Sequence, residues 1–417
     1  MGTRVIVIGG GAREHALVRA LRRGGLLPGA EAREIVAIPG NAGIVAEAKC
    51  VQAGSGARAL ADAAASEKPD LVVVGPEAPL AQGLADELAR HGIPCFGPSA
   101  AAARIEASKS FAKQVMAEAG VPTAEAATFR DPARARAHAR GPCVVKVDGL
   151  AAGKGVVVCA GAEEAARAID GLSAAHPGEP LLVEERLEGK ELSLIALCDG
   201  ERVLPLPPAR DHKRLLDGDR GPNTGGMGAF SPPADATPEL VARAIAEVFD
   251  PTLRAMARRG TPFCGALYAG LMLTAKGPRV LEFNCRLGDP EAQAILIRLR
   301  SDPLPLFRAA ALGDLRGVEA SWDARAAVAV VVAAAGYPAS PRTGDGIEGL
   351  PADADDLWVL HAATRAQGGR LVSAGGRVLT LAALGEGAAA ARRRAYQAAA
   401  EVRLAGAQMR SDIAAGE

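Results

Sequence analysis

Two lysines lie in a segment of unusual composition, PCVVKVDGLAAGKGVVVC, which spans residues 142–159. The pattern predicts two short apolar strands joined by a glycine-rich tip, that is, a hairpin. Lys146 interrupts the first strand, where an unpaired ammonium would be costly, whereas Lys154 lies between Gly153 and Gly155 at the tip. Such a hairpin could close over a polyphosphate, with Lys146 fixed beneath and the tip descending from above. An exposed hairpin with accidental lysines is the alternative, and the GxxxxGK[ST] spacing of a P-loop is absent.

A second set of chemically capable residues ends another expected strand, in the segment EFNCRLGDPE at residues 282–291. Alternation along a strand places Glu282 and Asn284 on one face. Two hard oxygen ligands suit a magnesium ion that bridges phosphates, and Arg286 could grip an anion. A buried salt bridge would account for Glu282 and Arg286, but it would not account for Asn284 or for the GDPE turn.

Acidic residues follow the strand expected over residues 181–184. Here the strand becomes a linker at residues 185–187, and Glu191 lies a little further on. The unpaired backbone groups of such a linker can read the edge of an adenine, while Glu184 or Glu191 accepts from an amine or a ribose hydroxyl. Ordinary surface acids are the alternative.

Two further segments lack any hydrophobic period. RDHKR covers residues 210–214 and GPNTGGMG covers residues 221–228, which predicts a long loop that core packing does not require. Ordered loops of this kind are usually functional. A helix over residues 105–119 carries Lys109 and Lys113 on one face; solvated lysines remain the alternative there.

The elements that must position these residues begin with alternating strands and helices. Strands are expected at residues 4–8, 34–38 and 71–74, with helices at residues 13–22, 57–65 and 80–90. This alternation indicates a doubly wound parallel sheet. Ligands bind at the carboxyl ends of such strands, here the GGG, GN and GPE turns. A nicotinamide site is disfavoured because Glu14 stands where the third glycine of GxGxxG belongs.

A small lid domain is expected over residues 121–187, inserted in a larger one. A helix over residues 237–249 precedes strands at residues 268–274 and 279–284. From residue 326 onward, short strands alternate before a closing helix over residues 388–404, and this part offers no motif of its own.

Composition excludes several classes of protein. The chain has 417 residues, enough for two to four domains, and its 48 basic and 48 acidic residues cancel, so no overall field would attract nucleic acid. The longest apolar runs are too short for a membrane span. Seven scattered cysteines without CxxC spacing argue against zinc and against a disulfide framework, and they fit reduced thiols in the cytosol.

The segments GGGAREHAL, VVKVDGLAAGKGVVV, VEERLEGKELS, DHKR, GPNTGGMGAFSP and LEFNCRLGDPE, in this order and spacing, closely resemble the phosphoribosylamine–glycine ligase family of the ATP-grasp superfamily. The resemblance covers essentially the whole chain. VVK, GKG and EFN are shared by many ATP-grasp proteins, whereas GGGAREHAL, DHKR and GPNTGGMGA are specific to this ligase.

The resemblance implies an α/β fold in several parts. These are an N-terminal doubly wound parallel-sheet domain that binds substrate over residues 1–103, an ATP-grasp central domain over 104–121 and 188–325, a lid subdomain over 122–187, and a small C-terminal α/β domain over 326–417. It implies ATP-dependent ligation of glycine to 5-phosphoribosylamine, through glycyl phosphate, to give glycinamide ribonucleotide, ADP and phosphate in de novo purine biosynthesis. Magnesium or manganese would be required. A cytoplasmic monomer with only small-molecule substrates, and with neither nucleic acid nor membrane as a partner, is expected.

Residue roles are carried over from the family motifs. Nucleotide binding is assigned to Lys109, Lys146, Gly153, Lys154, Gly155, Glu184, Glu185, Leu187 and Glu191. Metal binding is assigned to Glu282 and Asn284. Binding of glycine and phosphoribosylamine is assigned to Gly11, Asn41, Glu77, Asp211, Asn223, Thr224, Gly225, Arg286, Gly288 and Asp289. Catalytic roles are assigned to Arg286, Lys146, Lys154 and Asp211.

This chain departs from the family pattern at Val147, Lys190 and Leu287, and none of these removes a group that the chemistry requires. Two other functions are considered. A biotin carboxylase-like ATP-grasp enzyme would share the lid and metal residues but not DHKR or GPNTGGMGA. A regulatory nucleotide-binding protein that had lost catalysis should have lost some of the phosphate and metal residues, yet all are present.

Overall fold

The N-terminal part of the chain is built on a five-stranded parallel sheet. The computed structural model describes residues 2–150 and 155–417. The strand order is β3-β2-β1-β4-β5, so the chain reverses direction across the sheet between β1 and β4. The doubly wound sheet expected from the sequence is therefore confirmed. In chain order the elements are β1 (Thr3–Gly9), α1 (Ala12–Gly24), β2 (Arg33–Pro39), η1 (Ile44–Ala46), β3 (Lys49–Cys50), α2 (Ala57–Ser66), β4 (Leu71–Val74), α3 (Glu77–Ala81), α4 (Leu84–Arg90) and β5 (Cys95–Phe96).

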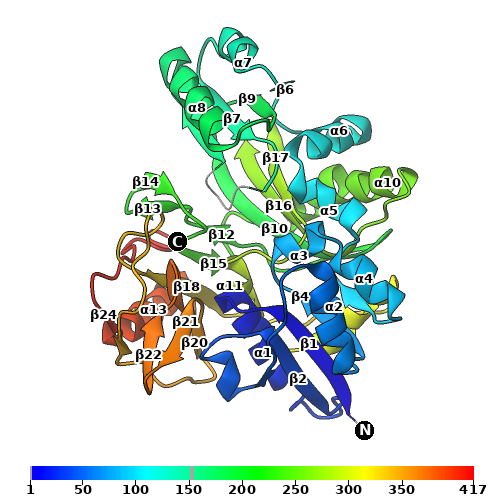
Figure 1. Ribbon diagram of the computed structural model, residues 1–417, viewed down its shortest axis with the longest axis vertical. Coiled ribbons are helices and arrows are strands. Elements are labelled where there is room, and N and C mark those ends of the chain that lie inside the picture. Colours follow the sequence, from blue (N-terminus) through cyan, green and yellow to red (C-terminus); the bar gives the residue numbers. More distant parts are fainter. Residues whose placement is uncertain (1, 151–154) are drawn as a thin grey trace.

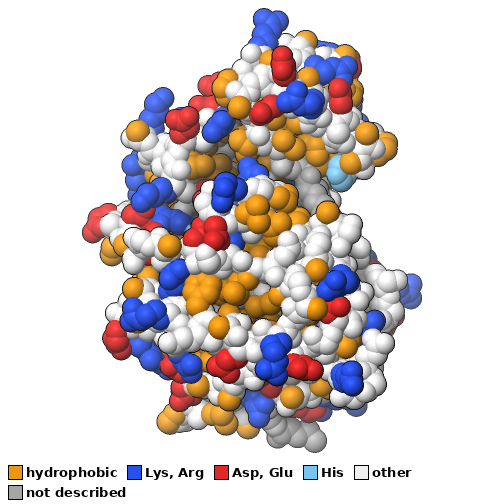
Figure 2. Space-filling view, turned by 90° about the vertical axis from the view of Figure 1, so that its left-hand side faces the viewer, with side chains coloured by type: hydrophobic (Ala, Val, Ile, Leu, Met, Phe, Trp, Pro, Cys, Tyr) orange, Lys and Arg blue, Asp and Glu red, His pale blue; other side chains and the backbone are white. Residues whose placement is uncertain are grey.

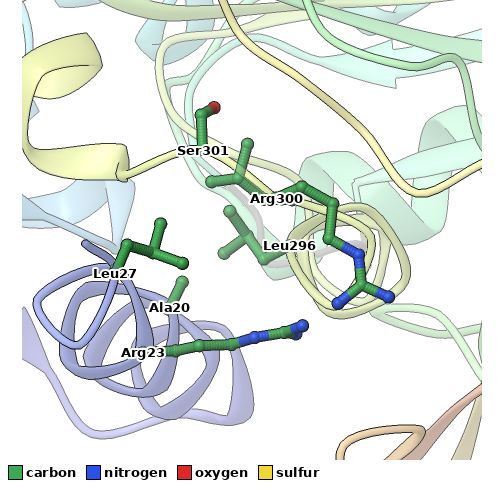
Figure 3. Close-up of a pocket in the computed structure, with 8 residues that line it drawn as sticks. Ala20, Arg23, Leu27, Leu296, Arg300 and Ser301 are labelled. Atoms are coloured by element: carbon green, nitrogen blue, oxygen red, sulfur yellow. The ribbon is translucent and has the colours of Figure 1, made fainter.

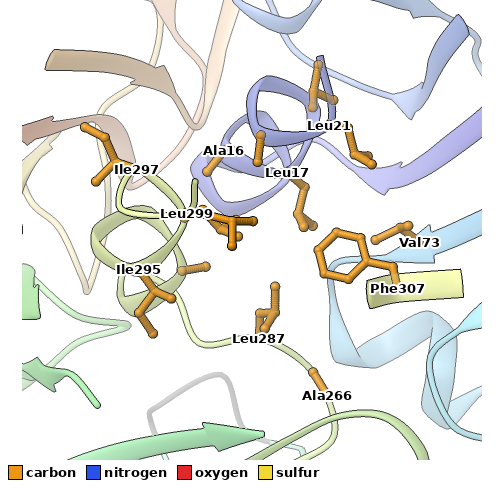
Figure 4. Close-up of a cluster of buried hydrophobic side chains, with 14 of the residues drawn as sticks. Ala16, Leu17, Leu21, Val73, Ala266, Leu287, Ile295, Ile297, Leu299 and Phe307 are labelled. Carbon is orange, nitrogen blue, oxygen red and sulfur yellow. The ribbon is translucent and has the colours of Figure 1, made fainter. Parts of the chain in front are cut away.

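Side chains of strand β1 alternate between two hydrophobic cores, as a strand covered on both faces requires. Val5 and Val7 enter a core shared with α1, in which Leu17 and Leu21 are fully buried (Figure 4). Ile6 and Ile8 enter the core on the opposite face. Strand β1 is thus fixed from both sides, and so is the glycine turn at its carboxyl end.

Two helices expected to be continuous are broken. Instead of one helix over residues 105–119, the chain forms α5 (Ala100–Ala107) and α6 (Lys109–Ala119). Ser108 leaves the helical conformation, and its hydroxyl accepts the backbone N–H of Phe111 at 3.2 Å, so it caps the second helix. The helix expected over residues 80–90 likewise breaks at Gly83, whose φ of +89° is left-handed. The first break places Lys109 at the start of α6.

The central part is an antiparallel sheet covered by helices. The strand order is β11-β10-β16-β17. The helix expected to end at residue 249 instead continues through a π-helical turn into α10. The elements are β10 (Lys190–Asp199), β11 (Val203–Pro205), α9 (Pro238–Ala244), η2 (Ile245–Phe249), α10 (Asp250–Arg258), β16 (Cys264–Thr274), β17 (Gly277–Asn284), α11 (Glu291–Leu296) and α12 (Pro303–Leu312).

The segment expected to form a lid folds as a unit at the top of the molecule (Figure 1). Its antiparallel sheet, in the order β6-β9-β7-β8, packs against two helices around a core of its own. The lysine hairpin is formed by β7 and β8, which pair from Cys143 with Cys159 to Lys146 with Val156. The elements are β6 (Ala126–Phe129), α7 (Pro132–His138), β7 (Cys143–Val147), β8 (Val156–Cys159), α8 (Ala162–Ala175) and β9 (Leu181–Glu185).

The C-terminal sheet recruits strands from much earlier in the chain. Its order is β12-β15-β18-β23-β20 (Figure 1). Strand β12 (Arg210–Asp211) lies in the RDHKR segment, and β15 (Gly228–Ser231) begins at the last residue of the GPNTGGMG segment. The expected loop is therefore corrected in part, because residues 221–223 belong to a strand, whereas residues 224–227 are loop. The remaining elements are β13 (Arg214–Leu216), β14 (Arg220–Asn223), β18 (Ala326–Ala333), β19 (Ile347–Glu348), β20 (Leu357–His361), β21 (Thr364–Gln367), β22 (Arg370–Ser373), β23 (Arg377–Gly385), α13 (Ala388–Glu401) and β24 (Arg403–Leu404). Within the described ranges, no helix has the length and apolarity needed to cross a membrane.

Two buried histidines join the first and last parts of the chain. The backbone N–H of His361 donates to Nδ1 of His15 at 2.9 Å, and Nε2 of His15 lies 3.0 Å from Glu47. Burial lowers the pKa of His15, and it lowers the pKa of His361 to about 4. Both rings are therefore neutral in the folded protein at neutral pH.

We expect these histidines to make folding sensitive to acid. When folding lowers the pKa of a histidine, protonation favours the unfolded state. The protein therefore keeps its full stability above the unfolded pKa, about 6.5, and loses stability as the pH falls toward the folded pKa. For His361 this is a loss of about 3 kcal/mol of unfolding free energy between about pH 6.5 and 4. The difference between wild type and His361→Gln, measured by urea unfolding across this range, should shrink as the pH falls. The exposed His91→Gln should follow wild type, and parallel curves for His361→Gln and wild type would refute the assignment.

Candidate active site

Strand β17 carries the two expected metal ligands into the cleft beneath the lid. Glu282 pairs across the sheet with Gly270, and Asn284 pairs with Tyr268, so both side chains project from the same face. Burial alone would raise the pKa of Glu282, but the ammonium groups of Lys213, Lys146 and Lys109 hold it below its ordinary value. Glu282 is therefore a carboxylate ready to bind a cation.

Glu106, which the sequence did not single out, orients Asn284. In the orientation that satisfies its neighbours, the Asn284 amide nitrogen donates to Glu106 Oε1 at 3.0 Å and to the Phe283 carbonyl at 3.2 Å. This turns Oδ1 away from these acceptors. The backbone N–H of Cys285 donates to Glu106 Oε2 at 2.7 Å. In the described ranges, no cluster of three or more His, Cys, Asp or Glu side chains forms a metal site. Glu282 and Asn284 thus fit a metal whose other ligands come from substrate phosphates.

Arg286 bridges two parts of the fold. Its Nη2 donates to Glu106 Oε1 at 2.9 Å, and its Nε lies 3.4 Å from Glu77, which is in the GPE turn after β4. Although burial opposes the charged form, these two carboxylates raise the pKa of Arg286 above its ordinary value. Nε is buried and has no hydrogen-bond acceptor among the described residues. A permanently charged guanidinium with a spare donor suits an anionic substrate.

Lys146, on the hairpin strand β7, has partners for its buried ammonium, as expected for a lysine in an apolar strand. Its Nζ donates to the Leu281 carbonyl at 2.9 Å and lies 2.9 Å from Glu184 Oε2. Lys113 lies 3.4 Å from the same oxygen. The alternative that Lys113 is an ordinary solvated lysine is therefore wrong. Glu184 Oε1 is buried without a partner among the described residues, which leaves one acceptor aimed into the site.

The other expected nucleotide contacts surround this group. Lys109 donates to the Gly149 carbonyl at 2.8 Å at the base of the lid, and burial lowers its pKa. The carboxylate of Glu185 lies 3.3 Å from Arg279. The backbone N–H of Glu185 donates to the Glu125 carbonyl at 2.8 Å, so this N–H is not free for a ligand. Leu187 is half-buried in the linker, and Gly155 accepts the N–H of Val147 at 2.9 Å. Gly153 and Lys154, expected at the tip, lie outside the described residues.

Lys213, another residue that sequence reasoning missed, sits among carboxylates. Its Nζ lies 2.9 Å from Glu191, the expected ribose contact, and 3.8 Å from Glu282. Burial raises the pKa of the neighbouring Asp211 to about 8. The ammonium of Lys213 lowers this pKa, and nearby carboxylates raise it. Asp211 is thus poised to exchange a proton near neutral pH. The signal for Lys213 was present in the sequence, because the DHKR segment contains it beside Asp211.

The glycine turn after β1 is occupied by a carboxylate. The N–H of Gly11 donates to Glu14 Oε2 at 2.6 Å, at the start of α1 where a dinucleotide would place its diphosphate. A Cβ on Gly75 would fall 2.0 Å from the same carboxylate. This explains physically why the nicotinamide reading fails. Asn41 uses its side chain to bond the Gly10 and His361 carbonyls and two N–H groups. Its backbone carbonyl accepts the N–H of Val45 at 3.1 Å, so a substrate would meet the backbone N–H of Asn41.

The remaining expected substrate contacts form a closely packed pair of loops. Thr224 donates its hydroxyl to the Lys213 carbonyl at 2.8 Å, and Asn223 ends β14 beside Arg214. Gly225 and Asp289 both accept hydrogen bonds from Arg377. A Cβ on Gly288 would fall 2.4 Å from Glu291 Oε2, so a larger residue there would displace the buried Glu291 side chain.

The surface supports a cleft here. Figure 2 shows the molecule hollowed between the lid and the body, with hydrophobic side chains gathered at the hollow. A separate cavity between α1 and the end of α11 contains none of the expected site residues and encloses about 70 Å³ (Figure 3). Ligand pockets usually enclose about 300 to 1,000 Å³, so this cavity is too small for a nucleotide.

Comparisons with known proteins agree with the geometry. Three domain models of phosphoribosylglycinamide synthetase match the chain: the N domain at residues 3–106, the ATP-grasp (A) domain at 107–292 and the C domain at 327–416. The phosphoribosylamine–glycine ligase of Streptomyces coelicolor is 54% identical over 99% of both chains, and that of Rhizobium meliloti is 46% identical over 98% of this chain and 97% of its own.

Solved structures give the same result. The phosphoribosylamine–glycine ligase of Thermotoga maritima superposes with a TM-score of 0.83 at 33% identity, covering 99% of this chain and 100% of that one. A biotin carboxylase from Campylobacter jejuni, at 15% identity and a TM-score of 0.74 over 100% of this chain and 94% of that one, shares the fold alone. The chain belongs to the phosphoribosylamine–glycine ligase family.

Proposed function

We propose that this chain uses ATP to ligate glycine to 5-phosphoribosylamine in purine biosynthesis, and that it does so through glycyl phosphate. The observation that carries the proposal is the meeting of two sets of groups in one cleft. One set contains cations and oxygen ligands suited to a triphosphate, with Lys146 and Glu282 among them. The ligase-specific DHKR segment meets this set through Lys213, which lies 3.8 Å from Glu282, and Arg286 contacts both Glu77 and Glu106.

The nucleotide would lie between the lid and β17. Lys146 and Lys109 would contact its phosphates, and Lys154 would join them from the hairpin tip. Glu184 Oε1 is a buried acceptor without a partner among the residues that the structure describes, which supports its bonding to the exocyclic amine of adenine. The backbone carbonyl of Glu185 and the backbone of Leu187 would read the rest of the base edge, and Glu191 would contact the ribose.

Glu282 and Asn284 would hold magnesium or manganese, because a carboxylate and an amide oxygen are hard ligands of the kind both ions accept. Such an ion supplies charge neutralisation to the phosphates when it is bound. The chain's own lysines and arginine would neutralise the remaining negative charge. The closed lid would keep water from the acyl phosphate.

The chemistry needs no protein nucleophile. A glycine carboxylate oxygen attacks the γ-phosphorus of ATP, ADP leaves, and glycyl phosphate forms. The amine of phosphoribosylamine then attacks the acyl carbon, inorganic phosphate leaves, and the amine loses a proton. Arg286 would orient the carboxylate and the transferred phosphoryl group, and Asp211 would accept the proton, a role that its raised pKa supports. Gly11, Glu77, Asn223, Thr224, Gly225, Gly288 and Asp289 would line the substrate side.

The purified protein should form glycinamide ribonucleotide and ADP only when glycine, freshly generated phosphoribosylamine and ATP with magnesium are all present. Mass spectrometry of the products checks this, with omission of each substrate as the control. Product from bicarbonate in place of glycine, with none from glycine, would instead assign the chain to the ATP-grasp carboxylases.

The finer expectations about the whole chain are also proposals. We propose the boundaries 1–103, 104–121 with 188–325, 122–187 and 326–417, although strands β12 and β15 pair with the C-terminal sheet. Each of the seven cysteines is a free thiol, which supports a reducing compartment such as the cytoplasm. A monomer is expected, which sedimentation analysis can check.

A further inference from the structure

We propose that Arg377, on β23 of the C-terminal sheet, is a positioning residue for glycine and phosphoribosylamine. It would act by holding the two loops assigned to these substrates in one fixed arrangement. The inference rests on the proposed function of those loops, residues 223–228 and 286–291. It gives the C-terminal part of the chain, which carries no motif, a specific role in the reaction.

The guanidinium of Arg377 bonds to both loops at once. Its Nη1 donates to the Gly225 carbonyl at 2.5 Å and to the Asp289 carbonyl at 2.8 Å. Its Nη2 donates to Asp289 Oδ2 at 2.7 Å. The other carboxylate oxygen of Asp289 accepts from Gln293 at 2.7 Å, so the aspartate is fixed from two sides. A planar fork of donors is what this arrangement needs, and lysine would not reproduce it.

The two loops approach one another more closely than ordinary residues would allow. A Cβ on Gly226, whose φ is +109°, would fall 2.4 Å from Pro290 Cδ. A Cβ on Gly225 would fall 3.1 Å from Arg377 Cζ, so the guanidinium packs directly on the glycine backbone. The N–H of Gly225 donates to the hydroxyl of Tyr337 at 2.9 Å. Both polar groups of Gly225 are therefore held by side chains from the C-terminal part of the chain.

Charge also links Arg377 to the opposite wall of the site. Although burial favours the neutral acid, the cations of Arg377 and Arg13 hold the pKa of Asp289 below its ordinary value. Arg13 itself lies beside the glycine turn after β1 and donates to the Leu287 carbonyl at 3.1 Å. Asp289 thus connects the C-terminal sheet to the N-terminal turn, across the loop that carries Arg286.

The nucleotide residues are held by a different set of contacts. Lys146 is fixed by Glu184 and the Leu281 carbonyl, and Lys109 by the Gly149 carbonyl. Within the described part of the chain, the hydrogen bonds of Arg377 go to Gly225, Gly226 and Asp289 and not to these residues. Loss of Arg377 should therefore disturb the substrate loops and leave nucleotide binding nearly unchanged, a separation that a general loss of fold would not produce.

The test compares Arg377→Gln and Arg377→Lys with a matched control, Arg403→Gln. Arg403 also lies in the C-terminal part, and its side chain is 73% exposed beside Glu348. For each full-length protein, calorimetry gives the Kd for ADP, steady-state kinetics give KM for glycine and for phosphoribosylamine, and thermal unfolding gives Tm.

We expect Arg377→Gln to raise both KM values at least about tenfold, equivalent to about 1.4 kcal/mol, while the Kd for ADP stays within about twofold. Arg377→Lys keeps the charge but loses the fork, so its KM values should fall between those of wild type and Arg377→Gln. Arg403→Gln should match wild type throughout.

Unchanged KM values in folded Arg377→Gln would overturn the proposal. Equal losses of ADP and substrate binding would also overturn it, because they would make Arg377 a general scaffold residue. If Arg377→Gln does not fold, the same separation of KM from ADP binding must appear in Arg377→Lys. Failure of the proposed function itself is distinguishable, since wild-type protein would then form no glycinamide ribonucleotide.

Discussion

Glu282→Gln should lower kcat/KM by about 30- to 150-fold at limiting magnesium. The substitution removes one charge from a hard-oxygen site, and losing one such stabilising group at a reacting centre typically costs about 2 to 3 kcal/mol of transition-state stabilisation. The fold should survive, because Lys213 keeps its 2.9 Å contact with Glu191. Initial rates across a magnesium titration measure the effect.

The matched control is Glu247→Gln, which removes a glutamate whose partner, Arg243, is four residues earlier in the sequence and 2.9 Å away on the surface. This variant should follow the wild-type magnesium curve. If Glu282→Gln follows it too, Glu282 does not bind the metal.

Arg286→Gln is expected to have the larger effect, with turnover falling by at least about a thousandfold. Arginines that stabilise a transferring phosphoryl group contribute about 10³ to 10⁵ in kcat. Stability should fall as well, because Glu106 would be left as a buried carboxylate without its cation, which typically costs about 3 to 5 kcal/mol. Urea unfolding and single-turnover rates report the two losses separately.

A double variant separates the loss of turnover from the loss of stability. Glu106→Gln combined with Arg286→Gln removes the orphaned charge, so it should recover much of the stability while remaining inactive. Recovery of turnover in the double variant would show that Arg286 serves only the fold, and wild-type turnover in Arg286→Gln alone would remove it from the mechanism.

Local patterns were enough to predict the sheet and the hairpin. Alternating apolar strands and helices indicated the doubly wound N-terminal sheet, and the structure has it. A lysine in an apolar strand demanded a partner, and Lys146 has one in Glu184. The spacing of Glu282 and Asn284 placed both on one face, as observed. Each of these inferences depends on residues close together in the sequence.

The features that could not be predicted from the sequence depend on contacts between residues far apart in the chain. Strands β12 and β15 were not expected because they are short and are stabilised by a sheet whose other strands begin at residue 326. Glu106, Lys213 and Arg377 were missed for a related reason, since each gains its role from a partner far away in the sequence. The helix break at Ser108 escaped notice because a serine within an alanine-rich stretch is compatible with either a cap or a helix interior.

The most direct test of the account follows oxygen from glycine. In the proposed reaction, one carboxylate oxygen of glycine is transferred with the γ-phosphoryl group and leaves in inorganic phosphate. With both carboxylate oxygens of glycine labelled with ¹⁸O, each phosphate released should therefore carry one ¹⁸O, and each amide of the product should keep the other. Mass spectrometry of both products gives the answer. Phosphate without label, formed alongside glycinamide ribonucleotide, would contradict a glycyl phosphate intermediate.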